Sequence, residues 1–141
     1  MKKDLYLMRH GQTLFNVRRR IQGWCDSPLT ELGKQQALKA KEILEEKGIN
    51  VRVADIHTIK PIDKNLIVKC AKETKRIITI EDHNIIGGLG SAICEVLSEE
   101  YPCLVTRMGI KDAFGKSGKA EELMKYFKID AESIVNEIVN G

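Results

Sequence analysis

Aromatic residues are scarce in this sequence, making up only 5% of its 141 residues. A surface that stacks the bases of single-stranded nucleic acid is therefore not expected. A strong excess of one charge is lacking as well, because 23 basic residues against 20 acidic ones leave a formal net charge of +3. So small an excess argues against electrostatic binding to nucleic acid or to an anionic membrane.

Long apolar runs are also missing, and the short run near the N-terminus is unlike a signal peptide or a membrane span. The cysteines are Cys25, Cys70, Cys94 and Cys103, and no two of them form a C-x-x-C pair. No histidine cluster accompanies them, so a metal site is not expected. We therefore expect a cytoplasmic protein without a metal, a nucleic-acid partner or a membrane partner.

The composition that is present, 43% hydrophobic and 30% charged, is that of a globular domain. Short apolar runs predict strands at residues 5–8, 51–55, 76–81 and 103–108. Apolar residues recurring every three to four positions predict helices between these strands and after the last one. The alternation predicts a parallel sheet with helices on both faces.

Local signals delimit these helices. The first helix is predicted over residues 31–47, Asp63 is predicted to cap the second, and Gly87, Gly88 and Gly90 open the third. The side chains predicted to face the core from the last three helices are Leu89, Ala92, Ile93, Val96 and Leu97, then Leu123, Met124 and Phe127, then Ile134, Val135, Ile138 and Val139.

Arg9, His10 and Gly11 follow the first predicted strand and open a long polar loop. A neutral imidazole nitrogen can attack phosphorus and hold the phosphoryl group covalently. A guanidinium beside it neutralises the phosphate oxygens through directed hydrogen bonds. Glycine lets the backbone approach a ligand because it has no Cβ. Taken as a bare tripeptide, these residues are better interpreted as an exposed polar turn after a strand.

The motif extends well beyond this tripeptide. It runs Leu7-Met8-Arg9-His10-Gly11-Gln12-Thr13, Asn16, Arg20-Ile21-Gln22-Gly23-Trp24, Asp26-Ser27-Pro28-Leu29-Thr30 and Gly33. Over about residues 5–36, it resembles the opening of the histidine phosphatase superfamily, which includes cofactor-dependent phosphoglycerate mutase. The resemblance implies that His10 is a phosphohistidine nucleophile beside Arg9. It also implies a phosphate site of Arg9, Gly11 and Asn16, with Arg20 as a further candidate.

The remainder of that family's site has no counterpart in the sequence. The family supplies a second arginine, an acidic proton donor and a second histidine from later segments, and no S-x-x-x-R-A stretch or late His-Gly pair is present. Transition-state stabilisation depends on the whole charge cluster. We therefore expect weak phosphate binding and little turnover.

A second pattern begins at about residue 37. Its strongest stretch is Ile78-Thr79-Ile80-Glu81-Asp82-His83-Asn84-Ile85-Ile86-Gly87-Gly88-Leu89-Gly90-Ser91-Ala92. Residues 37–141 resemble the C-terminal domain of transketolase. That family moves a two-carbon ketol unit with thiamine diphosphate, which is held between two other domains. The resemblance thus implies no cofactor here, because thiamine diphosphate is not expected to bind this chain alone.

The two resemblances join inside the first predicted helix, near residues 35–38, where the apolar stripe continues without a break. The phosphatase-like unit would then replace the strand, loop and helix that open the transketolase-type sheet. We predict a single α/β domain over residues 1–141, with three α/β/α layers and a parallel sheet of about four strands. The resemblance implies the strand order 2-1-3-4.

In that order, the loops after the first and third strands leave the sheet at a crevice where open α/β sheets bind ligands. We hypothesise that Arg9, His10 and Asn16 from one loop and His83 from the other form a shallow anion site. As a catalytic residue His83 is disfavoured, because a hydrogen-bonded structural or interface role explains it better.

The glycines of residues 87–90 admit two interpretations. They could form a phosphate site at a helix N-terminus, or they could permit a tight turn and close packing. The sequence lacks both the G-x-G-x-x-G spacing and the lysine of a phosphate-binding loop. The absence of these signals favours the structural turn.

Two functions follow from these patterns. The first is a chimeric or truncated α/β protein that is not a competent enzyme, with a vestigial phosphate-binding loop on a scaffold whose transketolase-type interface promotes homo-oligomer formation. The alternative is weak phosphatase or mutase activity through phosphohistidine at His10, with phosphate or a phosphorylated small molecule as ligand.

Overall fold

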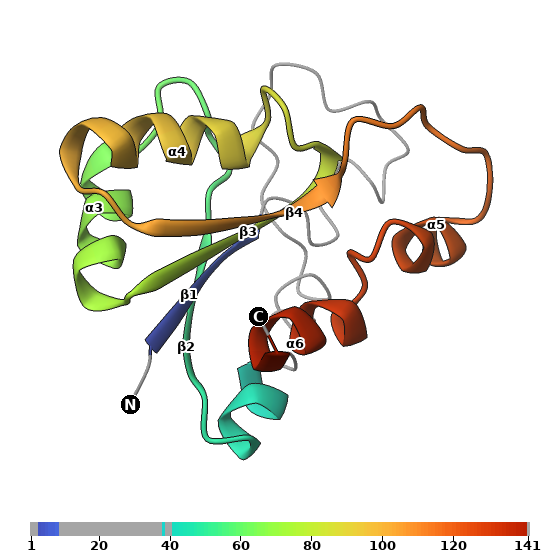
Figure 1. Cartoon of the computed structure of the whole chain (residues 1–141), viewed down its shortest axis with the longest axis horizontal. Helices are drawn as coiled ribbons and strands as arrows, with labels where there is room; N and C mark the ends of the chain where they lie inside the picture. Colours follow the sequence, from blue (N-terminus) through green and yellow to red (C-terminus); the bar gives the residue numbers. More distant parts are fainter. Residues whose placement is uncertain (1–2, 9–37, 39–40, 141) are drawn as a thin grey trace.

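The structure is a computed structural model that describes residues 3–8, 38 and 41–140. Its strands are β1 (Lys3–Met8), β2 (Asn50–Asp55), β3 (Arg76–Asn84) and β4 (Leu104–Ile110). Its helices are α3 (Lys64–Glu73), α4 (Leu89–Glu100), α5 (Ala120–Tyr126) and α6 (Ala131–Asn140), and residues 41–46 are also helical. Figure 1 shows the helices arranged around one twisted sheet.

The four strands are parallel and lie in the order β2-β1-β3-β4. β1 occupies an inner position, where Met8 pairs with Asp55 on one side and with Ile80 on the other. The predicted α/β class with a parallel sheet is confirmed. Because all strands run the same way, their carboxyl ends lie at one edge, from which the connecting loops depart.

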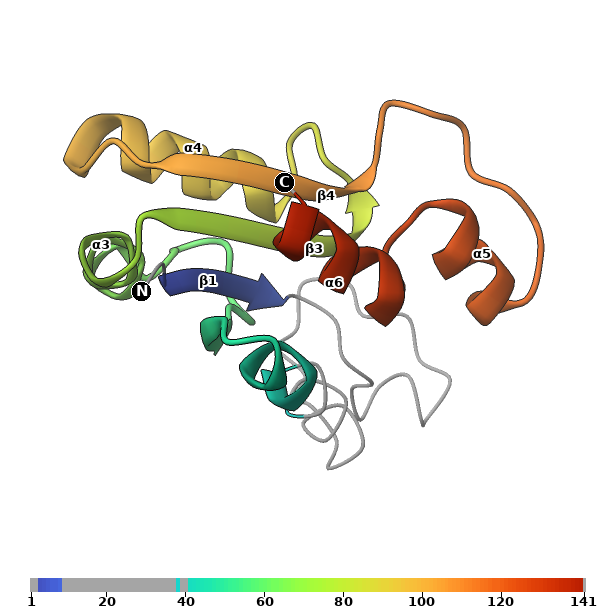
Figure 2. The ribbon, with the colours of Figure 1, turned by 60° about the horizontal axis from the view of Figure 1, so that its bottom comes forward.

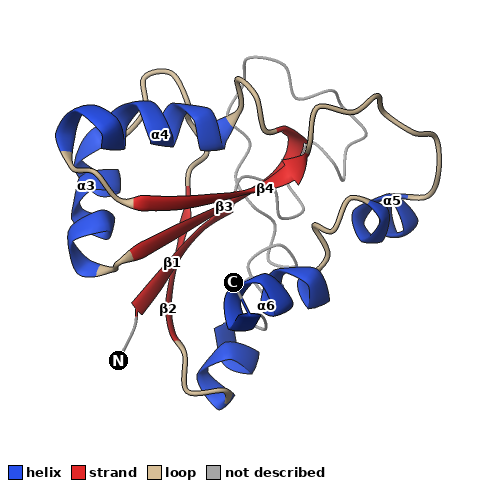
Figure 3. Cartoon of the chain, in the orientation of Figure 1, coloured by secondary structure: helices blue, strands red, loops and turns tan. Residues whose placement is uncertain are grey.

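The sheet is covered on both faces. Along β3, Ile77 joins the core of α3 and α4, whereas Ile78 and Ile80 join the core of α6 and the helical residues 41–46. This alternation is the two-residue period of a strand whose two faces are both buried. Figures 2 and 3 show α3 and α4 on one side and α6 on the other.

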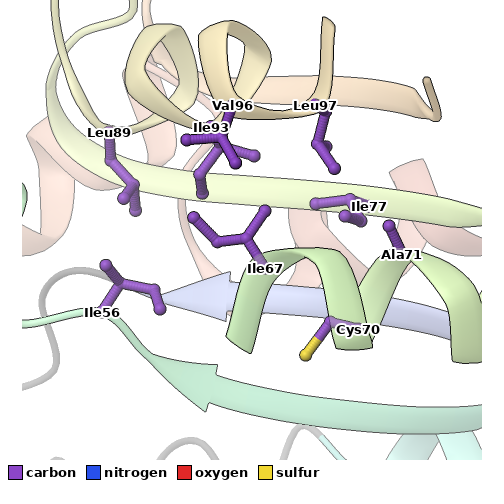
Figure 4. Close-up of a cluster of buried hydrophobic side chains, with 9 residues drawn as sticks. All are labelled: Ile56, Ile67, Cys70, Ala71, Ile77, Leu89, Ile93, Val96 and Leu97. Atoms are coloured by element: carbon purple, nitrogen blue, oxygen red, sulfur yellow. The ribbon is translucent and has the colours of Figure 1, made fainter. Parts of the chain in front are cut away.

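The larger core lies between α3, α4 and the sheet. Figure 4 shows Ile67 of α3 and Ile93 of α4 directed at one another, with Ile77 of β3 beside them. All three side chains are fully buried. The predicted cap of α3 is confirmed, because the Asp63 side chain accepts a hydrogen bond of 2.9 Å from the amide of Leu66.

Several boundaries and core positions differ from the sequence prediction. β3 continues to Asn84, because this residue pairs with Ile110 after an irregularity in the register. Met124 and Val139 were predicted to be buried, but they are 37% and 46% exposed. The prediction was wrong because each helix contacts the rest of the molecule through a narrower stripe, which in α6 consists of Ile134 and Ile138. Much of the predicted helix at residues 31–47 lies outside the described residues.

The buried core predicts a sharp contrast between two isoleucines. Ile93→Ala removes a fully buried side chain and should lower the free energy of unfolding by about 2–5 kcal/mol, because it leaves a cavity. The matched variant Ile86→Ala truncates a side chain that is 60% exposed and should change it by less than about 0.5 kcal/mol. Denaturant unfolding measures both, and equal losses would contradict the assigned core.

Candidate functional site

The carboxyl edge of the sheet is the place to look for a site in this fold. Of the residues predicted to handle phosphate, Arg9, His10, Gly11, Asn16 and Arg20 lie outside the described residues. His83 is described and lies near the end of β3, at this edge. Its ring is exposed, and its Nδ1 lies 2.8 Å from the backbone oxygen of Asn84.

A buried carboxylate governs the connection from β3 to α4. Glu81 is only 1% exposed. Its two carboxylate oxygens accept hydrogen bonds from the amides of Leu89 and Gly90, at 2.8 and 2.9 Å. These amides belong to the first turn of α4, where the partial positive charge of a helix end attracts anions. The protein's own side chain therefore occupies the position that a bound phosphate would take.

The glycines of this connection are explained by the same carboxylate. A Cβ built on Gly88 would lie 1.9 Å from an oxygen of Glu81. A Cβ on Gly90 would lie 2.7 Å from the side chains of Thr79 and Arg107. Gly87 adopts a φ of +74°, which favours glycine. The interpretation as a tight turn with close packing is confirmed at these positions.

Arg107 of β4 and Ser91 of α4 also hold the connection between β3 and α4 through hydrogen bonds. The Arg107 guanidinium donates to the backbone oxygen of Ile85 at 3.1 Å and to the Ser91 hydroxyl at 3.3 Å. The Ser91 hydroxyl donates to the same oxygen of Ile85 at 2.9 Å and accepts from the amide of Gly87 at 3.0 Å. The sequence analysis singled out neither residue. The only signal was Arg107, which is the one charged residue of β4.

Large apolar side chains at the same edge of the sheet are exposed to solvent. Ile86 lies at the tip of the loop and is 60% exposed. Phe114 lies in the next loop of the same edge, after β4, and is 98% exposed. The loop carrying Ile86 is held to the end of β4, because the amide of Ile85 donates to the oxygen of Ile110 at 3.0 Å.

Three titratable groups of the described residues have a shifted pKa. Burial raises the pKa of Asp55 at the end of β2, and the nearby His57 opposes this shift. Burial also raises the pKa of the Cys70 and Cys103 thiols, which lowers their thiolate fraction. Within residues 3–8, 38 and 41–140, no three metal-ligating side chains gather, and no helix is long and apolar enough to cross a membrane.

Comparisons with protein families match the two parts of the sequence. The model of the transketolase C-terminal domain matches residues 33–134, and that of the histidine phosphatase superfamily (branch 1) matches residues 5–54. Residues 33–54 are thus matched by both. The composite resemblance predicted from the sequence is confirmed, and its predicted join lies inside this shared segment.

Individual proteins agree with the larger match. A putative transketolase C-terminal section from Methanocaldococcus jannaschii is 48% identical over 105 residues, covering 74% of this chain and 32% of that protein. Transketolase from Rattus norvegicus is 43% identical over 118 residues, which cover 80% of this chain and 19% of that protein. The chain thus spans about a third or less of the length of these relatives.

A solved structure has the same fold. It is a split-gene transketolase in the form of an inactive beta4 tetramer, with a TM-score of 0.73 and 33% sequence identity. The superposition covers 98% of this chain and 38% of that protein.

Glu81 should be essential for the α4 connection. Glu81→Ala leaves two helix amides without an acceptor in a buried place and should lower the free energy of unfolding by about 2–4 kcal/mol. Glu81→Gln keeps the shape but only one good acceptor, and should cost about half as much. The exposed neighbour offers the control Asp82→Asn, which should be neutral to about 0.5 kcal/mol. Denaturant unfolding measures the three variants, and equal losses of unfolding free energy in all three would disprove the role of Glu81.

Proposed function

Because this chain belongs to the transketolase C-terminal domain family, we propose that it is a non-catalytic α/β scaffold that associates with copies of itself. The observation that carries the proposal is the carboxyl edge, where a loop held by Glu81, Arg107 and Ser91 presents Ile86 to solvent. Contiguous exposed apolar surface is typical of interaction sites, and Ile86 and Phe114 are two large exposed apolar side chains of this edge. The tetrameric assembly of the matching split-gene transketolase supports this direction.

We extend the proposal to the organisation of the chain. Residues 1–141 form a single domain in which the phosphatase-like segment supplies β1 as an inner strand of a transketolase-type sheet. The pairing of β1 with both β2 and β3 supports this arrangement. An inner strand forms backbone hydrogen bonds with two neighbours, whereas an edge strand forms them with one. The phosphatase-like segment would therefore be an integral part of the fold.

The start of α4 leaves no place for the diphosphate group of thiamine diphosphate. Helix amides and bound cations are common partners of such a group. The amides at the start of α4 are already bonded to Glu81, and the described residues offer no metal-holding cluster. We therefore propose that the scaffold acts without this cofactor.

Self-association should depend on one edge of the sheet. We expect the wild-type mass to rise with concentration in sedimentation equilibrium. The double variant Ile86→Asp with Phe114→Asp should shift this equilibrium toward the monomer by roughly tenfold or more, because charge replaces exposed apolar surface. Leu104→Asp is the matched control, since Leu104 is 64% exposed at the opposite end of β4. A wild-type protein that stays monomeric, or equal dissociation by the control, would refute the proposal.

A second candidate is phosphoryl transfer at His10, and the match of residues 5–54 to the histidine phosphatase superfamily favours it. In this alternative, His10 attacks the phosphorus of a phosphoester, the alcohol leaves, and Arg9 and Asn16 stabilise the transferred group.

Incubation with a labelled phosphoester should then leave acid-labile phosphate on the protein, and His10→Ala should abolish it. His57→Ala is the matched control, because it removes another exposed imidazole and leaves the predicted phosphate site unchanged. Wild-type labelling no greater than that of His10→Ala would rule out this candidate and leave the scaffold proposal intact.

A further inference from the structure

A cavity of about 770 Å³ lies between the end of β4 and the two C-terminal helices. Figure 1 shows the long loop after β4 arching around this region to reach α5 and α6. The cavity is lined by Lys111 after β4, by Tyr126 and Lys128 at the end of α5, and by Ser133 and Asn136 of α6. It shares Arg107 with the network that holds the Glu81 loop, but Ile86 and Phe114 of the proposed self-association do not line it.

The described residues that line this cavity carry three positive charges, on Arg107, Lys111 and Lys128, against one negative charge, on Glu137. Among residues 41–140, Lys111 and Lys128 form no ion pair, and both are exposed to solvent. The one carboxylate in the wall, that of Glu137, is paired with Arg76 at 3.2 Å. Arg76 is itself fixed by a 3.1 Å hydrogen bond to Thr106. The cavity therefore has a neutralised wall and two free ammonium groups.

Lys128 occupies a backbone position that would suit glycine. Its φ is +57°, in the left-handed region that side chains disfavour. It ends α5 in a Schellman motif, because its amide donates to the oxygen of Lys125 at 3.1 Å and that of Ile129 donates to Met124 at 2.9 Å. Glycine is the usual residue here, so the lysine costs conformational energy. A strained residue that lines a cavity is an observation that points to function.

The second residue in a left-handed conformation lies between Lys111 and Ala113, which both line the cavity. Asp112 has a φ of +40° and directly follows Lys111. These are the two non-glycine residues with positive φ in the described chain. A third lysine, Lys116, lies 4.0 Å from the centre of the Tyr126 ring, which lines the cavity. Cationic groups thus gather from the loop after β4 and from the end of α5.

Helix α6 contributes the polar part of the wall. Ser133, Asn136 and Asn140 line the cavity at positions i, i+3 and i+7, opposite the apolar stripe of Ile134 and Ile138. The Ser133 hydroxyl donates to the Asp130 carboxylate at 2.6 Å, and its oxygen can still accept a hydrogen bond from a ligand hydroxyl. The amides of Asn136 and Asn140 can both donate and accept. A few polar groups of this kind fix the orientation of a ligand in a pocket.

We propose that this cavity binds a small organic anion carrying hydroxyl groups, with Lys128 and Lys111 on the anionic group and the polar stripe of α6 on the hydroxyls. Phosphate esters and carboxylates share this chemistry. Glycerol 3-phosphate and glycerate are therefore the two probes, and glycerol is the neutral control.

NMR titration of the full chain tests the proposal. At millimolar concentration, at least one anionic probe should shift the amide signals of Lys128, Ser133 and Asn136 in a saturable way, whereas glycerol should not. Lys128→Gly should weaken this binding by about fivefold, the effect expected from losing one partly solvated charge pair. This variant also relieves the left-handed strain, so a loss of binding cannot be attributed to unfolding.

The control variant is Lys125→Ala, which removes one positive charge from the same helix but does not line the cavity. It should leave the affinity within a factor of two. Equal weakening by both variants would reveal general attraction to a basic surface and overturn the proposal. The absence of saturable shifts with both anions would overturn it as well. A response to one probe alone would identify the anionic group that the cavity accepts.

Discussion

The contact of Glu81 with the start of α4 is the constraint on which the carboxyl edge depends. One buried carboxylate satisfies two helix amides, and this contact fixes the direction in which α4 leaves β3. It also dictates glycine at residue 88, where any Cβ would collide with the carboxylate. The same contact removes the helix end from the set of anion sites, because the anion is already part of the chain. The hydrogen bonds of Ser91 and Arg107 direct the backbone oxygen of Ile85 inward, and the side chain of Ile86 is exposed to solvent.

The sheet explains how two sequence families coexist in one chain. β1 comes from the segment matched by the histidine phosphatase superfamily and lies between β2 and β3. Parallel strands make the same backbone hydrogen bonds whatever their origin, so a foreign strand of suitable length can complete the sheet. Residues 5–8 of β1 form a short apolar run, which is the sequence pattern of a strand in a parallel sheet.

The two surfaces proposed for interaction differ in chemistry. The carboxyl edge is apolar at Ile86 and Phe114, which suits contact with another protein surface. The cavity beside α5 and α6 is cationic at Lys111 and Lys128, which suits a small anion. Both depend on the connections after β3 and β4, whose ends are tied by the hydrogen bond from Ile85 to Ile110. The helices behind the sheet provide the rigid support for both.

The sequence by itself determined the composite resemblance, the α/β class, the cap at Asp63 and the buried stripe of α4, because motifs and local periods of 2 and 3.6 residues carry these features. Only the tertiary structure decided that Glu81 fills the end of α4, that Arg107 reaches the oxygen of Ile85 across 22 positions, and that Lys128 lines a cavity with Ser133. It also exposed Met124 and Val139, which the helical period alone would bury. Such contacts join residues that are distant in the sequence and that packing brings together. A local sequence pattern does not identify these partners.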